Sequence, residues 1–369
     1  MTYSRSTAVS PYMEWAKLHS TARFNLATSG MLSFPLAELG VTIDQLEING
    51  PSIYGYEPLL QAIARRYRVP QECVVSAVGT SLANYLALAA TTEPGDEILV
   101  EQPTYELILS TARYLGLEIR RFPRRAENNF AIPADVERNL TPRTRVIAIC
   151  NLHNPSGALV PDSTLREIGA LARKSGAYVM VDEVYREMLF EPEPQSSFHI
   201  DPERFIVTNS LTKAYGLSGL RCGWVLAAPE LARRMFRIND LHGATFAHPA
   251  ELLSVIALEK LTQIAAHMKS ILDANRKLLQ DFLSSRDDLD YFWPEYGTIA
   301  FPRLKSGSVE DLCRLLREEF ETSIVPGHFF EDPERFRLGV GTQTESVTEA
   351  LQQFSRGLDR YKASVHVSA

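Results

Sequence analysis

The sequence predicts an α/β fold: a mainly parallel seven-stranded sheet sandwiched by helices, with a smaller α+β lobe after it. From about residue 57 onward, short apolar runs alternate with amphipathic stretches, which is typical of a parallel sheet covered on both sides. Several of these runs are apolar at nearly every position, as strands buried on both faces must be. A length of 369 residues also favours more than one lobe.

The expected elements follow one another along the chain. Strands of the large sheet are expected at residues 73–78, 98–101, 118–122, 146–150, 178–181, 205–208 and 223–227. Helical spacing of apolar residues predicts helices at 57–68, 81–90 and 165–174, and one long helix at 250–283. Strands at 298–301, 323–325 and 336–340 and helices at 309–319 and 346–361 are expected in the smaller lobe. We therefore divide the chain into an irregular N-terminal arm (1–45) that wraps onto the small lobe or a partner, a large domain (46–265) and a small domain (266–369).

Composition excludes several classes of function. A net charge of -7 and a pI near 5.7 argue against a nucleic-acid partner, since phosphate backbones attract basic surfaces. No segment approaches membrane-spanning length and the N-terminus has no apolar signal core, so a cytoplasmic protein without a membrane partner is expected. None of the 4 cysteines pairs in a CxxC motif or has a histidine at ligand spacing, which predicts a reducing compartment and no metal site.

The most informative segment ends an apolar run at a lysine, Lys213. A lysine at the mouth of a sheet is partly desolvated, which lowers its pKa and frees the neutral amine for imine chemistry. The hydroxyls of Ser210 and Thr212 precede it, and Arg221 follows where a phosphate would need a cation. The segment predicts a site for an aldehyde that carries a phosphate, although most lysines after strands are ordinary solvated residues.

Other polar residues follow strands that end at the same edge of the sheet, where ligands of open α/β sheets bind. Small residues opening a helix expose N–H groups and hydroxyls to an anion, and a carboxylate closing a buried strand needs a cation. Taken alone, each of these features is also common in ordinary turns, helix caps and packing. The residues are Gly79, Thr80 and Ser81 after one strand, Tyr105 after the next, Asn154 in an Asn-Pro turn, and Asp182 and Tyr185 after a fourth.

Together and in this order, these motifs resemble the aminotransferase class I/II family, pyridoxal 5'-phosphate (PLP) dependent enzymes of fold type I. The resemblance runs from roughly Gly55 to Gly341 through N-P-S-G, D-E-V-Y, S-L-T-K and G-L-S-G-L-R-C-G. It implies an amino-acid aminotransferase that moves an amino group from an L-amino acid to a 2-oxo acid, working as a homodimer.

The resemblance also implies a role for each matching residue. Lys213 would form the internal aldimine and shuttle the proton, Asp182 would pair with the pyridinium nitrogen, and Tyr185 and Asn154 would hold the ring's phenolic oxygen. Tyr105 would stack on the ring, and Arg337 would bind the substrate α-carboxylate, with Asn154 and Gly30 beside it. The phosphate would lie among Gly79, Thr80, Ser81, Ser210, Thr212 and Arg221.

Some positions depart from the family pattern. Where members often carry a tyrosine that reaches the partner subunit's phosphate, this chain has Gly50, so Tyr54 is the candidate instead. Residues 240–249 contain no arginine for a substrate side-chain carboxylate, and a dicarboxylate preference is therefore not supported.

A PLP-dependent lyase or cyclase on the same fold stays open as an alternative. Tyr185 favours transfer, because carbon–sulfur lyases resembling this family tend to have histidine there. However, Tyr54-Gly55-Tyr56 resembles those lyases, and the short N-terminus resembles cyclases that act on modified arginines.

Overall fold

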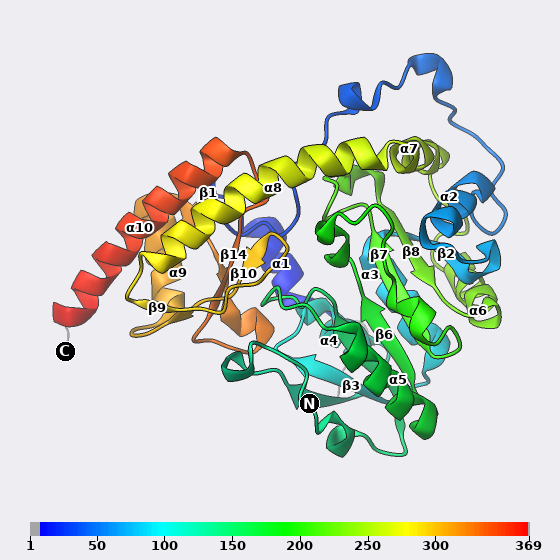
Figure 1. Cartoon of the computed structure of the whole chain (residues 1–369), viewed down its shortest axis with the longest axis horizontal. Helices are drawn as coiled ribbons and strands as arrows, with labels where there is room; N and C mark the ends of the chain where they lie inside the picture. The colour runs from blue at the N-terminus through cyan, green and yellow to red at the C-terminus, as the bar shows by residue number, and fades with distance from the viewer. Residues whose placement is uncertain (1–7, 368–369) are drawn as a thin grey trace.

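The large sheet has seven strands in the order β2-β8-β7-β6-β5-β3-β4 in the computed structural model, which describes residues 8–367 (Figure 1). Neighbouring strands are parallel from β7 to β4, and only β8 runs antiparallel to its neighbours. The mainly parallel seven-stranded sheet predicted from the sequence is thereby confirmed. The strands are β2 (Val74–Val78), β3 (Glu97–Gln102), β4 (Glu118–Pro123), β5 (Thr144–Cys150), β6 (Tyr178–Asp182), β7 (Phe205–Ser210) and β8 (Cys222–Leu226).

Helices cover both faces of this sheet, which explains why its strands are apolar at nearly every position. Along β5, Ile147 and Ile149 belong to the core on one face and Val146 and Ala148 to the core on the other. The first face packs against α2 (Glu57–Tyr67), α5 (Asp162–Ser175) and α7 (His248–Glu259). The second packs against α3 (Gly79–Thr91), α4 (Glu106–Tyr114) and α6 (Pro229–Asp240).

The C-terminal lobe has its own core between short strands and long helices. In it β10 (Ile299–Ala300), β14 (Phe336–Gly339) and β13 (Val325–Pro326) form one small sheet, and β9 (Leu289–Asp290) pairs with β11 (Arg303–Leu304). Three helices pack against them: α8 (Leu261–Ser284), α9 (Val309–Phe320) and α10 (Thr344–Val367). Since α8 runs from the large sheet to this lobe (Figure 1), it lies across the predicted boundary at residue 265, and the division into domains stays a prediction.

The single helix predicted over 250–283 is wrong, because the structure has two helices there. Helix α7 ends at Glu259, Lys260 leaves the helical conformation with φ -100° and ψ 11°, and α8 begins at Leu261. The Lys260 ammonium donates a hydrogen bond to the carbonyl oxygen of Leu39. Figure 1 shows that α7 and α8 run in different directions, which apolar periodicity alone does not reveal.

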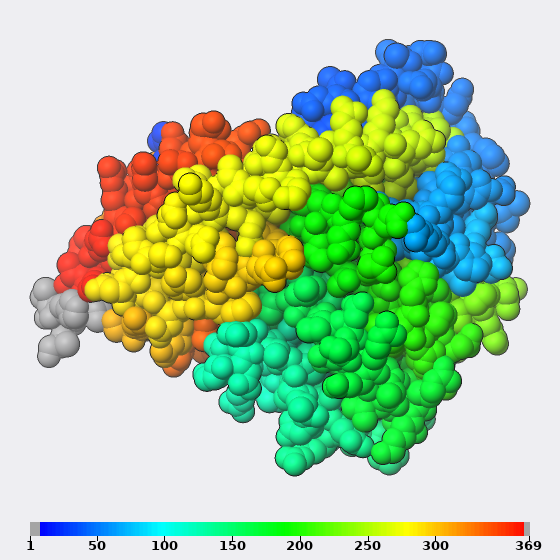
Figure 2. All heavy atoms as spheres, viewed as in Figure 1, coloured from blue at the N-terminus to red at the C-terminus, as the bar shows by residue number. Residues whose placement is uncertain are grey.

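The N-terminal segment is less irregular than predicted. It contains α1 (Pro11–Leu18), and β1 (Phe24–Asn25) pairs in parallel with β12 (Thr322–Ser323) of the C-terminal lobe. A Ser10 cap and Pro11 at the first position start α1. The segment between β1 and α2, coloured blue, lies at the upper edge of the molecule in Figure 2. Within residues 8–367, no helix is long and apolar enough to cross a membrane.

Candidate active site

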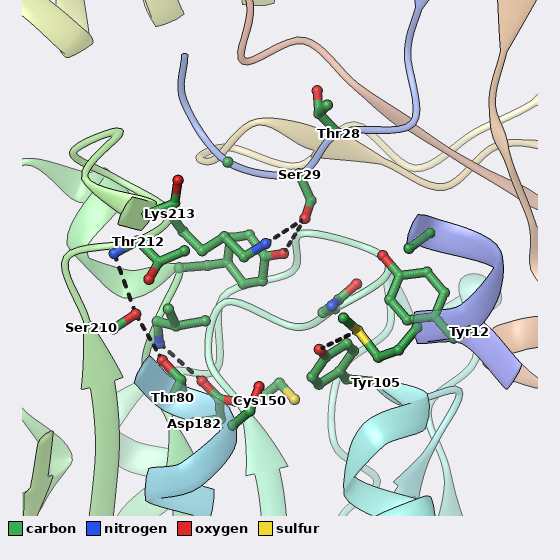
Figure 3. Close-up of a pocket in the computed structure, with 18 of the residues that line it drawn as sticks. Tyr12, Thr28, Ser29, Thr80, Tyr105, Cys150, Asp182, Ser210, Thr212 and Lys213 are labelled. Atoms are coloured by element: carbon green, nitrogen blue, oxygen red, sulfur yellow. Dashed lines mark hydrogen bonds between the residues drawn. The ribbon is translucent and has the colours of Figure 1, made fainter. Parts of the chain in front are cut away.

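A cavity of about 410 Å³ lies at the carboxyl ends of β5, β6 and β7, and α1 closes one side of it (Figure 3). Cavities of this size hold small ligands and cofactors. Most of the predicted site residues line it: Gly30, Thr80, Ser81, Tyr105, Asn154, Asp182, Tyr185, Ser210, Thr212, Lys213 and Arg221.

Lys213 projects into the cavity from the loop after β7. Its Nζ donates a hydrogen bond to Ser29 Oγ at 3.1 Å, and the Tyr185 hydroxyl donates to the same oxygen at 2.8 Å (Figure 3). The backbone N–H of Met31 binds the Lys213 carbonyl at 2.7 Å, which fixes the loop against the N-terminal segment. Burial lowers the pKa of Lys213, so at a given pH a larger fraction of this amine is neutral than for a surface lysine.

Asp182 closes β6 and lies at the bottom of the cavity. Asn84 Nδ2 donates to its Oδ2 at 2.9 Å, and the backbone N–H of Val184 donates to its Oδ1 at 3.1 Å. Burial raises the pKa of Asp182 to about 6. A fixed, dehydrated carboxylate of this kind is stabilised by a cation placed in the cavity beside it.

An anion cradle is built where α3 begins. The Thr80 hydroxyl donates to Ser210 Oγ at 2.9 Å, and Arg221 Nη2 donates to the Val78 carbonyl at 3.3 Å. Gly79 has φ +75°, and a Cβ built there would lie 2.4 Å from Arg221 Nη2. The helix N-terminus, two hydroxyls and a guanidinium therefore meet at a place where only glycine leaves room.

Arg337, on β14, is fully buried behind the cavity wall. Its Nη1 donates to Asn154 Oδ1 at 2.9 Å, while its Nη2 donates to the Tyr12 hydroxyl at 2.8 Å and to the Ala27 carbonyl at 3.3 Å. Its guanidinium also lies over the ring of Phe330, 5.0 Å from the centroid. The structure thus brings Arg337 to the edge of the site, with Tyr12 and Asn154 between it and the cavity.

Besides Arg337, two predicted residues do not line the cavity. Gly79 lies beneath Arg221, so close that a side chain at this position would meet the guanidinium. Tyr54 is 48% exposed and packs edge-on against Phe236, with ring centroids 5.9 Å apart. The role of Tyr54 at a partner's phosphate site stays a prediction.

Sequence reasoning missed three residues of the site: Tyr12, Ser29 and Asn84. Asn84 could have been identified from the sequence, since it is the single amide side chain in an alanine- and leucine-rich helix. Tyr12 and Ser29 gave none, because each meets its partner only after chain segments far apart in sequence come together.

The model of the family described as aminotransferase class I and II matches residues 42–354 of the chain. The chain belongs to this family. It is 30% identical over 363 residues to capreomycidine synthase of Streptomyces vinaceus, covering 94% of this chain and 93% of that protein. It is 28% identical to the arginine–pyruvate transaminase of Pseudomonas aeruginosa, over 82% of this chain and 80% of the relative.

Among solved structures, a PLP-dependent aminotransferase from Streptococcus suis 89-1591 superposes with a TM-score of 0.90 at 27% identity. The superposition covers 98% of this chain and 99% of that one. The fold is therefore fold type I, as the motifs predicted.

PLP is the cofactor of this family and of this chain. The cavity fits it on grounds independent of the family. Thr28 and Thr212 both line the cavity, and each has a buried hydroxyl oxygen without a hydrogen-bond partner. The buried Asp182 suits the ring's cationic nitrogen, and the cradle at Arg221 suits its phosphate.

Proposed function

We propose that this member of the family is an aminotransferase that moves an amino group from an L-amino acid to a 2-oxo acid. One observation carries the proposal: a dehydrated amine (Lys213) and a buried carboxylate (Asp182) line one cavity, and a buried guanidinium (Arg337) lies directly behind its wall. These are the groups needed to exchange a proton at Cα, to hold a cationic ring and to bind an α-carboxylate.

The cofactor's position would follow from the residues around the cavity. Asp182, held by Asn84, would keep the positive charge on the ring nitrogen. Tyr185 and Asn154 would hold the phenolic oxygen, since the Asn154 amide nitrogen is not engaged by Arg337. Tyr105 would lie along the ring. The phosphate would take the cradle of Gly79, Thr80, Ser81, Ser210, Thr212 and Arg221.

Bound PLP supplies an electron sink for the charge left at the substrate's Cα. Lys213, whose pKa is lowered by burial, would take the Cα proton as a general base. It would later give the proton back as a general acid, which completes the transfer of the amino group. Arg337 would hold the α-carboxylate by bidentate hydrogen bonds that replace its present ones to Asn154 and Tyr12. Gly30 would provide room beside Lys213.

A half-reaction tests this function. The purified protein is mixed with single L-amino acids in the absence of any 2-oxo acid, and the visible absorption of the lysine-bound cofactor is followed. A transaminase loses that band with one donor and releases the matching 2-oxo acid. In Lys213→Ala the band should be absent from the start, and a variant that keeps it would contradict the role of Lys213.

A cyclase or lyase is the second candidate, and one observation favours it. Capreomycidine synthase matches nearly the full length of the chain at 30% identity, whereas the arginine–pyruvate transaminase matches about four-fifths of it at 28%. The same Cα proton removal precedes loss of a group from Cβ, so Lys213 and Asp182 serve both reactions. In the half-reaction, a band that persists while ammonia, a thiol or a cyclised product appears would favour this second candidate.

We also propose that the working enzyme is a homodimer. Ile43, Ile48, Ile53 and Leu241 are 89%, 81%, 82% and 83% exposed, and a group of exposed apolar side chains favours an interaction surface. Tyr54 lies in the same stretch of chain and is the candidate to reach the partner's phosphate site. Light scattering after size exclusion should give twice the mass of the chain; a cofactor-loaded monomer would contradict the proposal.

A further inference from the structure

A buried polar cluster lies behind the active site and does not line its cavity. Its centre is the carboxylate of Glu187, which is 4% exposed. The hydroxyls of Tyr67 and Tyr215 and the guanidinium of Arg66 all donate to this carboxylate. Arg66 Nη2 also donates to the Tyr215 hydroxyl at 2.9 Å.

The cluster joins the two loops that carry the polar groups of the site. Tyr215 follows Lys213 on the loop after β7, and Glu187 follows Tyr185 on the loop after β6. The hydrogen bond from Tyr215 to Glu187 therefore ties the loop of the amine to the loop of the phenol. On the far side of the cavity, Ser29 bridges the same two residues, Lys213 and Tyr185.

A third connection leads to the anion cradle. Asn209 Nδ2 donates to the Tyr67 hydroxyl at 3.3 Å, and Asn209 Oδ1 accepts from the backbone N–H of Ser210 at 2.7 Å. Through Tyr67, the Glu187 carboxylate thus also reaches the strand end that presents Ser210 to the cavity.

The contribution of this cluster to stability does not by itself explain why charged groups are buried here. Burying a carboxylate and a guanidinium incurs a desolvation penalty that apolar residues of similar volume avoid. What the charged cluster adds is geometry, since charge-assisted hydrogen bonds weaken as their donors leave the preferred distance and angle. Its placement behind three site-bearing segments indicates what that geometry serves.

We propose that Glu187 is a positioning residue that fixes the loop of Lys213 relative to Tyr185 and thereby sets how the cofactor is held. The inference rests on the proposed function only in assigning Lys213 and Tyr185 to the cofactor. It predicts that loosening the cluster weakens cofactor binding and changes the ring's orientation without touching any cavity residue.

The test uses Glu187→Gln, Tyr215→Phe and a matched control, Glu97→Gln. Glu97 is also a buried carboxylate, accepting from the hydroxyls of Thr141 (2.8 Å) and Thr144 (2.5 Å), but it lies at the start of β3, at the end of the sheet away from the cavity. For each variant, the dissociation constant for PLP, the visible circular dichroism per bound cofactor and the urea midpoint are measured.

In Glu187→Gln and Tyr215→Phe we expect PLP to bind about fivefold to tenfold more weakly, an effect of the size of one buried hydrogen bond. Tyr215→Phe removes two such bonds, those of its hydroxyl with Glu187 and Arg66. The circular dichroism per bound cofactor should change in both, and Glu97→Gln should lower only the urea midpoint. Tyr215→Phe keeps the ring and removes only the hydroxyl, so it remains informative if Glu187→Gln does not fold.

Two results would overturn the inference: unchanged affinity and circular dichroism in Tyr215→Phe, or an equal loss of affinity in Glu97→Gln. A wild-type protein that binds no PLP, or a Lys213→Ala variant that keeps the visible band, would refute the proposed function instead, whatever the Glu187 variants show.

Discussion

Asp182→Asn should stabilise the cofactor-free protein while removing the group proposed to hold the ring nitrogen. An aspartate with the reference pKa titrates at 3.8, whereas burial raises the pKa of Asp182 to about 6. The folded state therefore binds this proton more tightly than the unfolded state does. The contribution to the free energy of unfolding is fully present below about pH 4 and is lost as the pH rises through about 6.

The size of the effect follows from this difference. A shift of about two pKa units corresponds to about 3 kcal/mol lost at neutral and alkaline pH. The amide of the variant does not ionise, so it escapes this loss, and it can still accept from the backbone N–H of Val184. It gives up the hydrogen bond from Asn84, which offsets about 1 kcal/mol. The expected net gain is about 2 kcal/mol at about pH 8.

The assay is urea unfolding of the cofactor-free proteins at about pH 8 and about pH 5. For a slope of about 3 kcal/mol per molar urea, the gain moves the midpoint upward by about 0.7 M at the higher pH. It should shrink to less than about 1 kcal/mol at the lower pH, where the wild-type carboxyl is largely protonated. Asp273→Asn, at an exposed pair with Lys269, is the control and should change stability by less than about 0.5 kcal/mol. A variant no more stable than wild type at pH 8, or a gain independent of pH, would refute this reasoning.

Three further substitutions test the site. Arg337→Lys should raise the KM for the amino acid by about a hundredfold, because an ammonium cannot pair bidentately with the carboxylate; steady-state kinetics with an unchanged KM would contradict this. Tyr12→Phe should lower that KM a few-fold, because it removes the hydroxyl that occupies Arg337 Nη2; a higher KM would show that the hydroxyl donates to the substrate. Gly79→Ala should weaken PLP binding by about tenfold or more, because φ is +75° and the new Cβ meets Arg221 Nη2. Fluorescence titration of the cofactor-free protein measures the affinity, and a wild-type value would contradict phosphate binding at this cradle.

The strand ends of the site could be predicted because their geometry is local. Asp182 ends β6 and Lys213 lies just beyond the end of β7, and parallel strands bring such residues to one edge of the sheet. Arg337 was predicted only through the family resemblance. Its contact with Tyr12 joins residues 325 positions apart, and Ser29 and Tyr185 are 156 apart. No periodicity encodes contacts of that range, so the covering of the site by α1 and the bridge at Ser29 required the structure.

One physical cause prepares both titrating groups of the cavity. Burial raises the pKa of Asp182 to about 6 and lowers that of Lys213, so the charged forms of both are disfavoured in the cofactor-free cavity. Above about pH 6, Asp182 is nonetheless ionised and ready for a cationic ring nitrogen, while Lys213 gains a larger share of the neutral amine with each step in pH. Below that pH, charging Asp182 costs about 1.4 kcal/mol per pH unit, so the affinity for PLP should fall about tenfold per unit until the carboxyl of the complex itself protonates. If Asp182 and Lys213 hold the cofactor as proposed, their burial would set the acid limit of cofactor binding and also favour the neutral amine.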